Sequence, residues 1–217
     1  VDAGDPRLGP LAVPGRYTVH LEVNGKSFTT KVEVLPDPRV HVPQKVLVDE
    51  RDFALRLRDA INEVSGLVRQ IRSIRQQLVA RNDLLKENPE AGSLIHASKE
   101  VIDKLNALEA KLQNPKAEVT YDILAQRGGA MLYSQLYFLF ANLNESDGPV
   151  TEGMHEVFAE QDKQLRSLDA QFHRLVGTDL AALTRLAHDK DIPDIIVPKR
   201  TLGAKKPTKS GTAGTQR

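Results

Sequence analysis

Residues 53–78, FALRLRDAINEVSGLVRQIRSIRQQL, decide the fold of this chain. Apolar residues recur in it at alternating intervals of four and three positions. Such heptad spacing places one apolar stripe along a single helix. The stripe consists of Phe53, Leu57, Ala60, Val64, Leu67, Ile71, Ile74 and Leu78. Ile61 and Val68 widen it, which favours packing in a bundle over a two-stranded coiled coil. The pattern predicts a helix over residues 45–82, on the order of 55 Å long.

Three further helices are predicted from shorter apolar stripes, at about 93–113, 130–144 and 151–187. We expect the last of these helices to bend at Gly177. Four antiparallel helices joined by connections of mixed length are typical of an up-and-down four-helix bundle. The sequence therefore predicts a mainly α fold, with the bundle occupying residues 40–198.

The bundle is preceded by a stretch with the alternating pattern of β-strands, RYTVHLEVNGKSFTTKVEV at residues 16–34. Asn24-Gly25 in its centre is the strongest short signal for a hairpin, because a type I′ turn needs positive φ at both positions. A two-residue loop pairs Tyr17 with Val32 and Leu21 with Phe28. The hairpin is therefore expected to carry one continuous apolar face.

An isolated two-stranded hairpin is marginally stable in water, and the residues before it resemble a loop. We interpret residues 1–39 as the end of an Ig-like or fibronectin-like sandwich, of which the hairpin supplies the last two strands. On this interpretation the chain is the C-terminal piece of a larger protein, and the bundle is expected to cover the apolar face of the hairpin. A free-standing hairpin docked on the helices is the alternative.

The composition excludes several classes of function. The chain of 217 residues is 40% hydrophobic and 27% charged, contains no cysteine, and has only 5% aromatic residues. No apolar run is long enough to span a membrane. Residues 199–217 carry six basic and no acidic side chains. Because the net charge of the whole chain is only +1, the basic surplus is confined to this segment. We expect a disordered basic tail, and no nucleic-acid partner, since such partners need a basic stripe on a folded element.

No catalytic, cofactor or metal site is predicted. His155-Glu156 begins the H-E-x-x-H zinc signature, but Ala159 stands where the second histidine is needed. Residues 203–210 imitate a phosphate-binding loop, but they lack the second glycine and any flanking strand or helix. The six histidines lie on different elements, and no pair of carboxylates is recognisable as a glycosidase site.

One cluster of residues is a candidate docking patch. Arg127, Gly128 and Gly129 come shortly before Tyr133 and Tyr137, in the most aromatic stretch of the chain. Two interpretations are open. Either the glycines form a sharp turn beside tyrosine rings that pack between helix ends, or the patch binds an upstream domain.

Five segments in this order resemble a known protein family. They are VPGRYTVHLEVNGKSFTTKVEVLPDPRV (13–40), FALRLRDAINE (53–63), RGGAMLYSQL (127–136), DGPVTEGM (147–154) and DIPDIIVP (191–198). Together they are similar to the C-terminal region of large bacterial sortilin-like or sialidase-like β-propeller proteins, often labelled glycosyl hydrolases with Asp-box (BNR) repeats. In that family a propeller comes first, an Ig-like domain next and a helical region last.

The resemblance implies an exported parent protein that recognises protein or glycan through its propeller. It gives this chain no catalytic residue, because no Asp-box and no tryptophan occur here. We therefore expect a non-catalytic accessory module, with the upstream propeller of the same chain as its partner. Two alternatives are that the chain belongs to a true glycoside hydrolase whose active site lies in the propeller, or that it is a self-associating helical adaptor.

Overall fold

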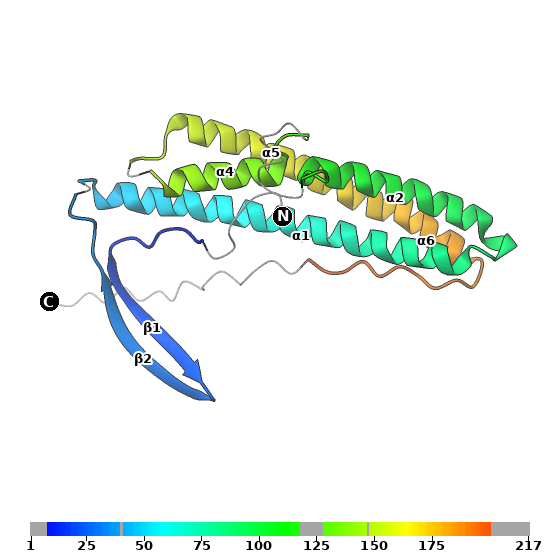
Figure 1. The fold of residues 1–217 in the computed structure, drawn as a ribbon, viewed down its shortest axis with the longest axis horizontal. Helices are drawn as coiled ribbons and strands as arrows, with labels where there is room; N and C mark the ends of the chain where they lie inside the picture. Colours follow the sequence, from blue (N-terminus) through cyan, green and yellow to red (C-terminus); the bar gives the residue numbers. More distant parts are fainter. Residues whose placement is uncertain (1–7, 40, 118–127, 147, 201–217) are drawn as a thin grey trace.

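A computed structural model describes residues 8–39, 41–117, 128–146 and 148–200. It shows an elongated helical body with a β-hairpin that projects from one end (Figure 1). A single long helix runs the length of the body, and shorter helices pack against it. The elements in order are β1 (Gly15–Val23), β2 (Lys26–Val34), α1 (Gln44–Leu85), the 3-10 turn η1 (Pro89–Ala91), α2 (Gly92–Leu112), α4 (Leu132–Asn144), α5 (Glu152–Leu175), the π-helical turn η2 (Val176–Leu180) and α6 (Ala181–His188).

The apolar stripe of α1 forms the centre of the core. All eight stripe residues from Phe53 to Leu78 are buried, and Val68 is buried beside them. The stripes of α2, α4 and α5 meet them in one hydrophobic cluster. The four predicted helices are thus confirmed, with α5, η2 and α6 following one another without a break as the fourth.

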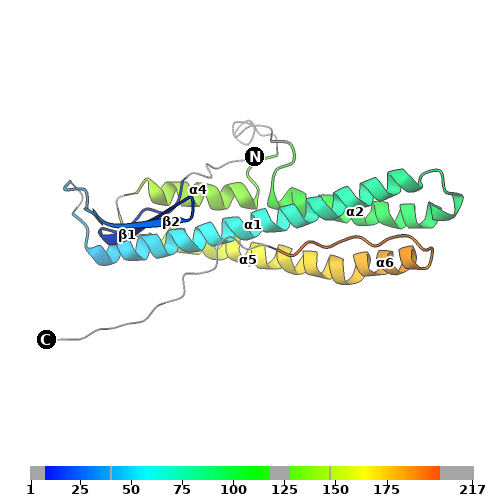
Figure 2. The same cartoon turned by 90° about the horizontal axis from the view of Figure 1, so that it is seen from below.

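The arrangement of the helices differs from an up-and-down four-helix bundle. Helix α2 packs on the second half of α1, and α4 packs on its first half. The two short helices therefore lie end to end, and both run antiparallel to α1 (Figures 1 and 2). The helix from α5 to α6 runs along the whole body beside them. Most cross-sections of the body therefore contain three helices. The reason is length, since neither α2 with 21 residues nor α4 with 13 residues is long enough alone to cover α1 with 42 residues.

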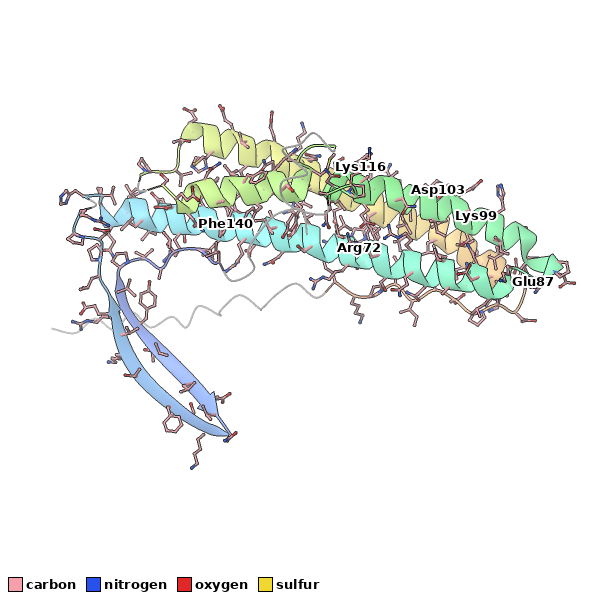
Figure 3. All side chains as sticks on the ribbon, viewed as in Figure 1. Arg72, Glu87, Lys99, Asp103, Lys116 and Phe140 are labelled. Atoms are coloured by element: carbon pink, nitrogen blue, oxygen red, sulfur yellow. The ribbon has the colours of Figure 1, made fainter. Side chains whose placement is uncertain are left out.

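Two sets of ion pairs between helices, which we call clasps, fix the positions of the helices along one another. The Glu109 side chain of α2 is only 8% exposed and accepts from Arg72 Nε at 2.6 Å and from Arg75 of α1. Arg72 lies in the second half of α1 (Figure 3). Arg166 of α5 binds Glu63 of α1 at 2.8 Å. A buried carboxylate needs such partners, so the clasp at Glu109 sets the position of α2 along α1.

Helix α5 begins and continues as its sequence predicts. The Thr151 hydroxyl accepts from Met154 N at 3.2 Å and caps the helix. Gly177 lies within η2, where the hydrogen-bonding pattern widens to a π-helical turn before α6. Thr178 Oγ1 donates to Arg174 O at 2.7 Å in the same turn. The helix therefore adjusts near Gly177 without ending there.

The hairpin has the predicted register. Tyr17 pairs with Val32 and Leu21 with Phe28, and β1 and β2 form a two-stranded sheet on their own. Asn24 and Gly25 have φ of 50° and 75°, as a type I′ turn requires. The expectation that the bundle covers the apolar face is wrong, because the hairpin extends away from the helices and its face is exposed (Figures 1 and 3).

Residues 192–200, which we call the strap, follow α6 and return along α1 in an extended conformation (Figure 2). The segment 192–198 packs back on the helices and is held there by hydrogen bonds to Gln77 and Gln70. The contacts continue to Arg200, which composition assigned to a disordered tail from residue 199. The rest of that predicted tail lies outside the described residues.

The contact between Gly66 and Arg200 generates the first prediction. A Cβ built on Gly66 has Arg200 Cγ at 3.1 Å and Cδ at 3.4 Å as its nearest neighbours. Gly66→Ala should add about 1 kcal/mol of helix stability when Arg200 is replaced by alanine, and clearly less in the unchanged chain. Urea unfolding of the two single variants and the double variant measures this coupling. Additive effects would contradict the contact.

Candidate functional site

The two glycines of the predicted docking patch form a turn built around Asn114. Gly128 and Gly129 have φ of 103° and 75°, which side chains other than hydrogen rarely allow. Asn114 is 2% exposed; its Nδ2 donates to Gly129 O at 2.8 Å and its Oδ1 accepts from Lys116 N at 2.9 Å. A Cβ on Gly128 would lie 3.2 Å from Asn114 Nδ2. The glycine pair therefore serves this close approach, while Arg127 lies outside the described residues.

The tyrosines of the patch are half-buried. Tyr133 and Tyr137 are four residues apart on α4, so they share one face of the helix. Both pack against the hydrophobic cluster, and the Tyr137 ring lies 6.3 Å from that of Phe138. The structure thus brings both rings to the bundle surface with much of each ring covered. A docking role for this patch stays a prediction.

The apolar face of the hairpin is the larger exposed surface. It combines the odd-numbered residues of β1 with the even-numbered residues of β2, which alternation places on one side of the sheet. Its large side chains are 38–56% exposed. They are Tyr17, Val19, Leu21, Val23, Phe28 and Val32. Large exposed apolar surfaces are uncommon on monomeric soluble proteins.

The opposite face of the hairpin is polar. Arg16 and Glu33 lie 3.9 Å apart across the strands, and Thr29 Oγ1 is 3.1 Å from His20 Nδ1. The sheet contains only β1 and β2, so within the described residues the outer edge of each strand has no ladder partner. Free edges beside an apolar face are the features that a further strand or sheet binds.

The base of the hairpin is anchored to α1. Gln44 Nε2 of α1 donates to Pro14 O at 3.4 Å. Within the base itself, Tyr17 Oη donates to Val13 O at 2.5 Å. A cavity of about 210 Å³ lies between this base and the start of α1. It is lined mainly by apolar side chains, among them Leu11, Val13, Leu35, Pro36, Val42 and Leu47. The hairpin is therefore held at its root and uncovered along its length.

A second, shallower hollow of about 280 Å³ lies between α2 and α5 and is lined by Lys104, Lys111, Arg174 and Asp179. Lys104 donates a hydrogen bond to Asp179. That bond lowers the pKa of the Asp179 carboxyl and raises the pKa of the Lys104 ammonium. The pair ties α2 to η2, so its charges are already engaged in structure.

No catalytic constellation is visible in the part of the chain that the structure describes. Its histidines, aspartates and glutamates form no group of three or more that is close enough to hold a metal ion. The His155 ring packs edge-on against Phe53 at 4.8 Å, and Arg56 lies 5.0 Å from the centre of the same Phe53 ring. His155 therefore has a packing role at the edge of the core.

Comparison with known proteins finds no matching family model, no matching curated protein and no matching solved structure. The resemblance to sortilin-like propeller proteins accordingly stays a prediction. Within the described ranges, no helix combines the length and the apolar character needed to cross a membrane.

Sequence reasoning missed two polar features. Asn114 was given no role, whereas its buried side chain bonds to the backbone of both Lys116 and Gly129. Gln70 and Gln77 were given no role, although they hold the strap. The available signal was weak, because an isolated glutamine on a helix is usually solvated.

The exposure of the hairpin gives a prediction about stability. Replacing both Leu21 and Phe28 by threonine should change the unfolding free energy of the helical body by less than about 0.5 kcal/mol. Leu67→Ala in the buried stripe should cost about 2–5 kcal/mol. Thermal and urea unfolding followed by circular dichroism at 222 nm measures both. A large loss in the hairpin variant would mean that its face packs on the helices.

The Asn114 turn gives a third prediction. Gly128→Ala should cost about 1–3 kcal/mol, because it strains the backbone and crowds Asn114. Gly92→Ala is the matched control, since Gly92 starts α2 with φ of −54° and a Cβ there meets no atom within 4 Å. Urea unfolding should show the loss at Gly128 alone. Equal effects at both positions would contradict the proposed geometry.

Proposed function

We propose that this chain is a non-catalytic interaction module. Its hairpin supplies two strands to a neighbouring β-sandwich domain, and its helical body serves as a rigid spacer. The observation that carries the proposal is the exposed apolar face of the hairpin, with a free edge on each strand. A two-stranded sheet is marginal alone, and three or more strands with a covered face are needed for independent stability.

The chemistry of the face favours a sheet as its partner. Strands alternate side chains between two faces, so a second sheet can pack flat against this one at about 10 Å. The exposed side chains are aliphatic or aromatic, as in the inner face of a sandwich. The polar outer face then remains in water, as in an antiparallel sheet that buries one side.

The helical body suits a spacer. Helix α1 is about 63 Å long at 1.5 Å per residue, and its stripe is buried along the whole body. The hairpin is joined to the first turn of α1 through the hydrogen bond from Gln44 to Pro14. A domain bound to the hairpin would therefore be held at one end of a stiff rod.

The resemblance stated above extends the proposal to a parent protein. On that view the occupant of the hairpin face is an Ig-like domain of the same chain, and an exported propeller further upstream binds protein or glycan. A hydrolase activity, if the parent has one, would belong to the propeller. The self-association alternative is less favoured, because the stripe of α1 that would pair between chains is already buried within one chain.

The mass of the native gene product tests the proposal. Mass spectrometry of the source cells' exported fraction should find these peptides at the C-terminal end of a species several-fold heavier than 24.0 kDa. A native species near 24.0 kDa would contradict the accessory role.

Hydrogen exchange then tests the docking surface directly. Amides on the outer edge of β1 should exchange more slowly in the native gene product than in the 217-residue chain, because a neighbouring strand or sheet covers them. Amides in the centre of α1 are the internal control and should be equally protected in both. Equal exchange of β1 in the two proteins would overturn a sheet partner.

A further inference from the structure

The strap lies antiparallel to α1 in a fixed register. Pro193 lies beside Arg81, Ile196 beside Gln77, Pro198 beside Gln70 and Arg200 beside Gly66. From Gly66 to Arg81 the helix rises about 22 Å. An extended chain covers about 23 Å from residue 193 to residue 200. The strap is therefore stretched out beside the helix with its contacts spaced to match.

Two glutamines of α1 bind the backbone of the strap. Gln77 Nε2 donates to Ile196 O at 2.8 Å, and Gln77 Oε1 accepts from Ile196 N at 2.9 Å. One side-chain amide thus pairs with both backbone groups of a residue, as a neighbouring β-strand does. Gln70 Nε2 donates to Pro198 O at 2.8 Å, and Gln70 is 8% exposed. These bonds satisfy backbone groups and do not depend on the side chain of the bound residue.

The side chain of Ile196 supports this conclusion. It is 73% exposed even though both of its backbone groups are bound. Ile192 and Ile195 are partly buried against the hydrophobic cluster. The site therefore holds an extended backbone and adds two apolar contacts on the side that faces the helices.

A specific side-chain contact is found at Arg200. Its guanidinium bonds to Asp169 of α5, and its Nε donates to Gln70 Oε1 at 3.2 Å. Its aliphatic stem crosses α1 at Gly66, where a Cβ would meet Cγ at 3.1 Å. The absent side chain at Gly66 and the carboxylate at Asp169 together select a long cationic residue that donates several hydrogen bonds.

The opposite end of the strap is held less well. Arg81 Nη1 is 3.5 Å from Pro193 O, while Arg81 Nε and Nη2 are buried without a hydrogen-bond partner. Burial lowers the pKa of the Arg81 guanidinium, and the charge of Asp194 partly offsets this effect. Buried groups without a hydrogen-bond partner make the arrangement with the strap bound to α1 less stable. Asp191, with φ of 55°, forms the turn where the strap leaves α6.

From these contacts we propose that the strap site is a binding site for an extended peptide that carries an arginine. The strap site comprises Gly66, Gln70, Gln77 and Arg81 of α1 with Asp169 of α5. Residues 192–200 occupy it as a releasable segment, and the same segment of a second copy of this chain can replace them.

A second copy is the occupant that matches the chemistry. The strap of another chain would make the same bonds to Gln70, Gln77 and Asp169, so only the linkage between strap and site distinguishes the two arrangements. Within one chain the linkage gives the strap a high effective concentration. Exchange between copies therefore requires that the intramolecular strap be weakened or outcompeted.

A labelled peptide of residues 191–200 tests the proposal on the full chain. The variant Ile195→Asp with Arg200→Ala removes an apolar contact and the arginine contact of the strap, so its own segment should leave the site. We expect this variant to bind the peptide at least about ten-fold more tightly than the unchanged chain, as measured by fluorescence anisotropy, since the unchanged site is occupied. Circular dichroism verifies that the variant keeps its helices.

Two controls separate this site from non-specific binding. The same peptide with Arg200→Ala should bind at least about ten-fold more weakly, because it lacks the bonds to Asp169 and Gln70. Adding Gly66→Leu to the chain variant should abolish binding of the arginine peptide, because the leucine fills the space of its stem. Failure of the arginine peptide to bind, or equal binding of the two peptides, would overturn the proposal.

The unchanged chain provides a second measurement if the variant loses its helices. An excess of the arginine peptide should speed hydrogen exchange at the Ile196 amide of the chain, because it displaces the strap from Gln77. The alanine peptide should leave that exchange unchanged. An Ile196 amide that responds to neither peptide would show that the segment is not exchangeable, and the proposal would fail.

Discussion

The whole structure depends on the need to cover one uninterrupted apolar stripe on α1. The stripe is fully buried from Phe53 to Leu78, and a helix of about 63 Å leaves such a stripe in water unless partners run beside it over its whole length. The helix from α5 to α6 does so as one continuous element, aided by the π-helical turn at Gly177. Helices α2 and α4 share the other side. The buried Glu109 clasp then holds α2 in its lengthwise position.

The sequence predicted the helices well because the spacing of apolar residues determines which face of each helix is buried. The same holds for the hairpin, whose alternation and Asn24-Gly25 turn predicted the observed register. Periodicity shows which face of a helix is buried, but it does not show which helix covers that face. The end-to-end placement of α2 and α4 was missed for that reason. Helix length carried the missing signal, since a rod of 42 residues cannot be covered by a neighbour of 21 or 13 alone.

The functional surfaces were predicted less completely, for a related physical reason. Alternation predicted the apolar face of the hairpin but could not show whether the helices cover it, because burial is a property of the assembled fold. A turn at the glycines 128 and 129 was one of two open interpretations, while their partner Asn114 was given no role. Glutamine and asparagine are common on exposed surfaces, so only the structure shows that Gln70, Gln77 and Asn114 satisfy backbone groups of distant segments.

The strap and the hairpin differ in whether the backbone hydrogen-bonding groups of an extended segment find partners on a neighbouring helix. A helix uses its own backbone groups internally, so it can bind an extended backbone only through side chains. The strap finds such side chains in Gln77 and Gln70, which bond to the backbone of Ile196 and Pro198. At the other end of α1 the charged side chains of the first turns bind one another, as Lys45 does with Asp49 and Arg51 with Asp52. The outer edges of β1 and β2 find no comparable partner among the described residues, and another β-strand is the element that supplies one.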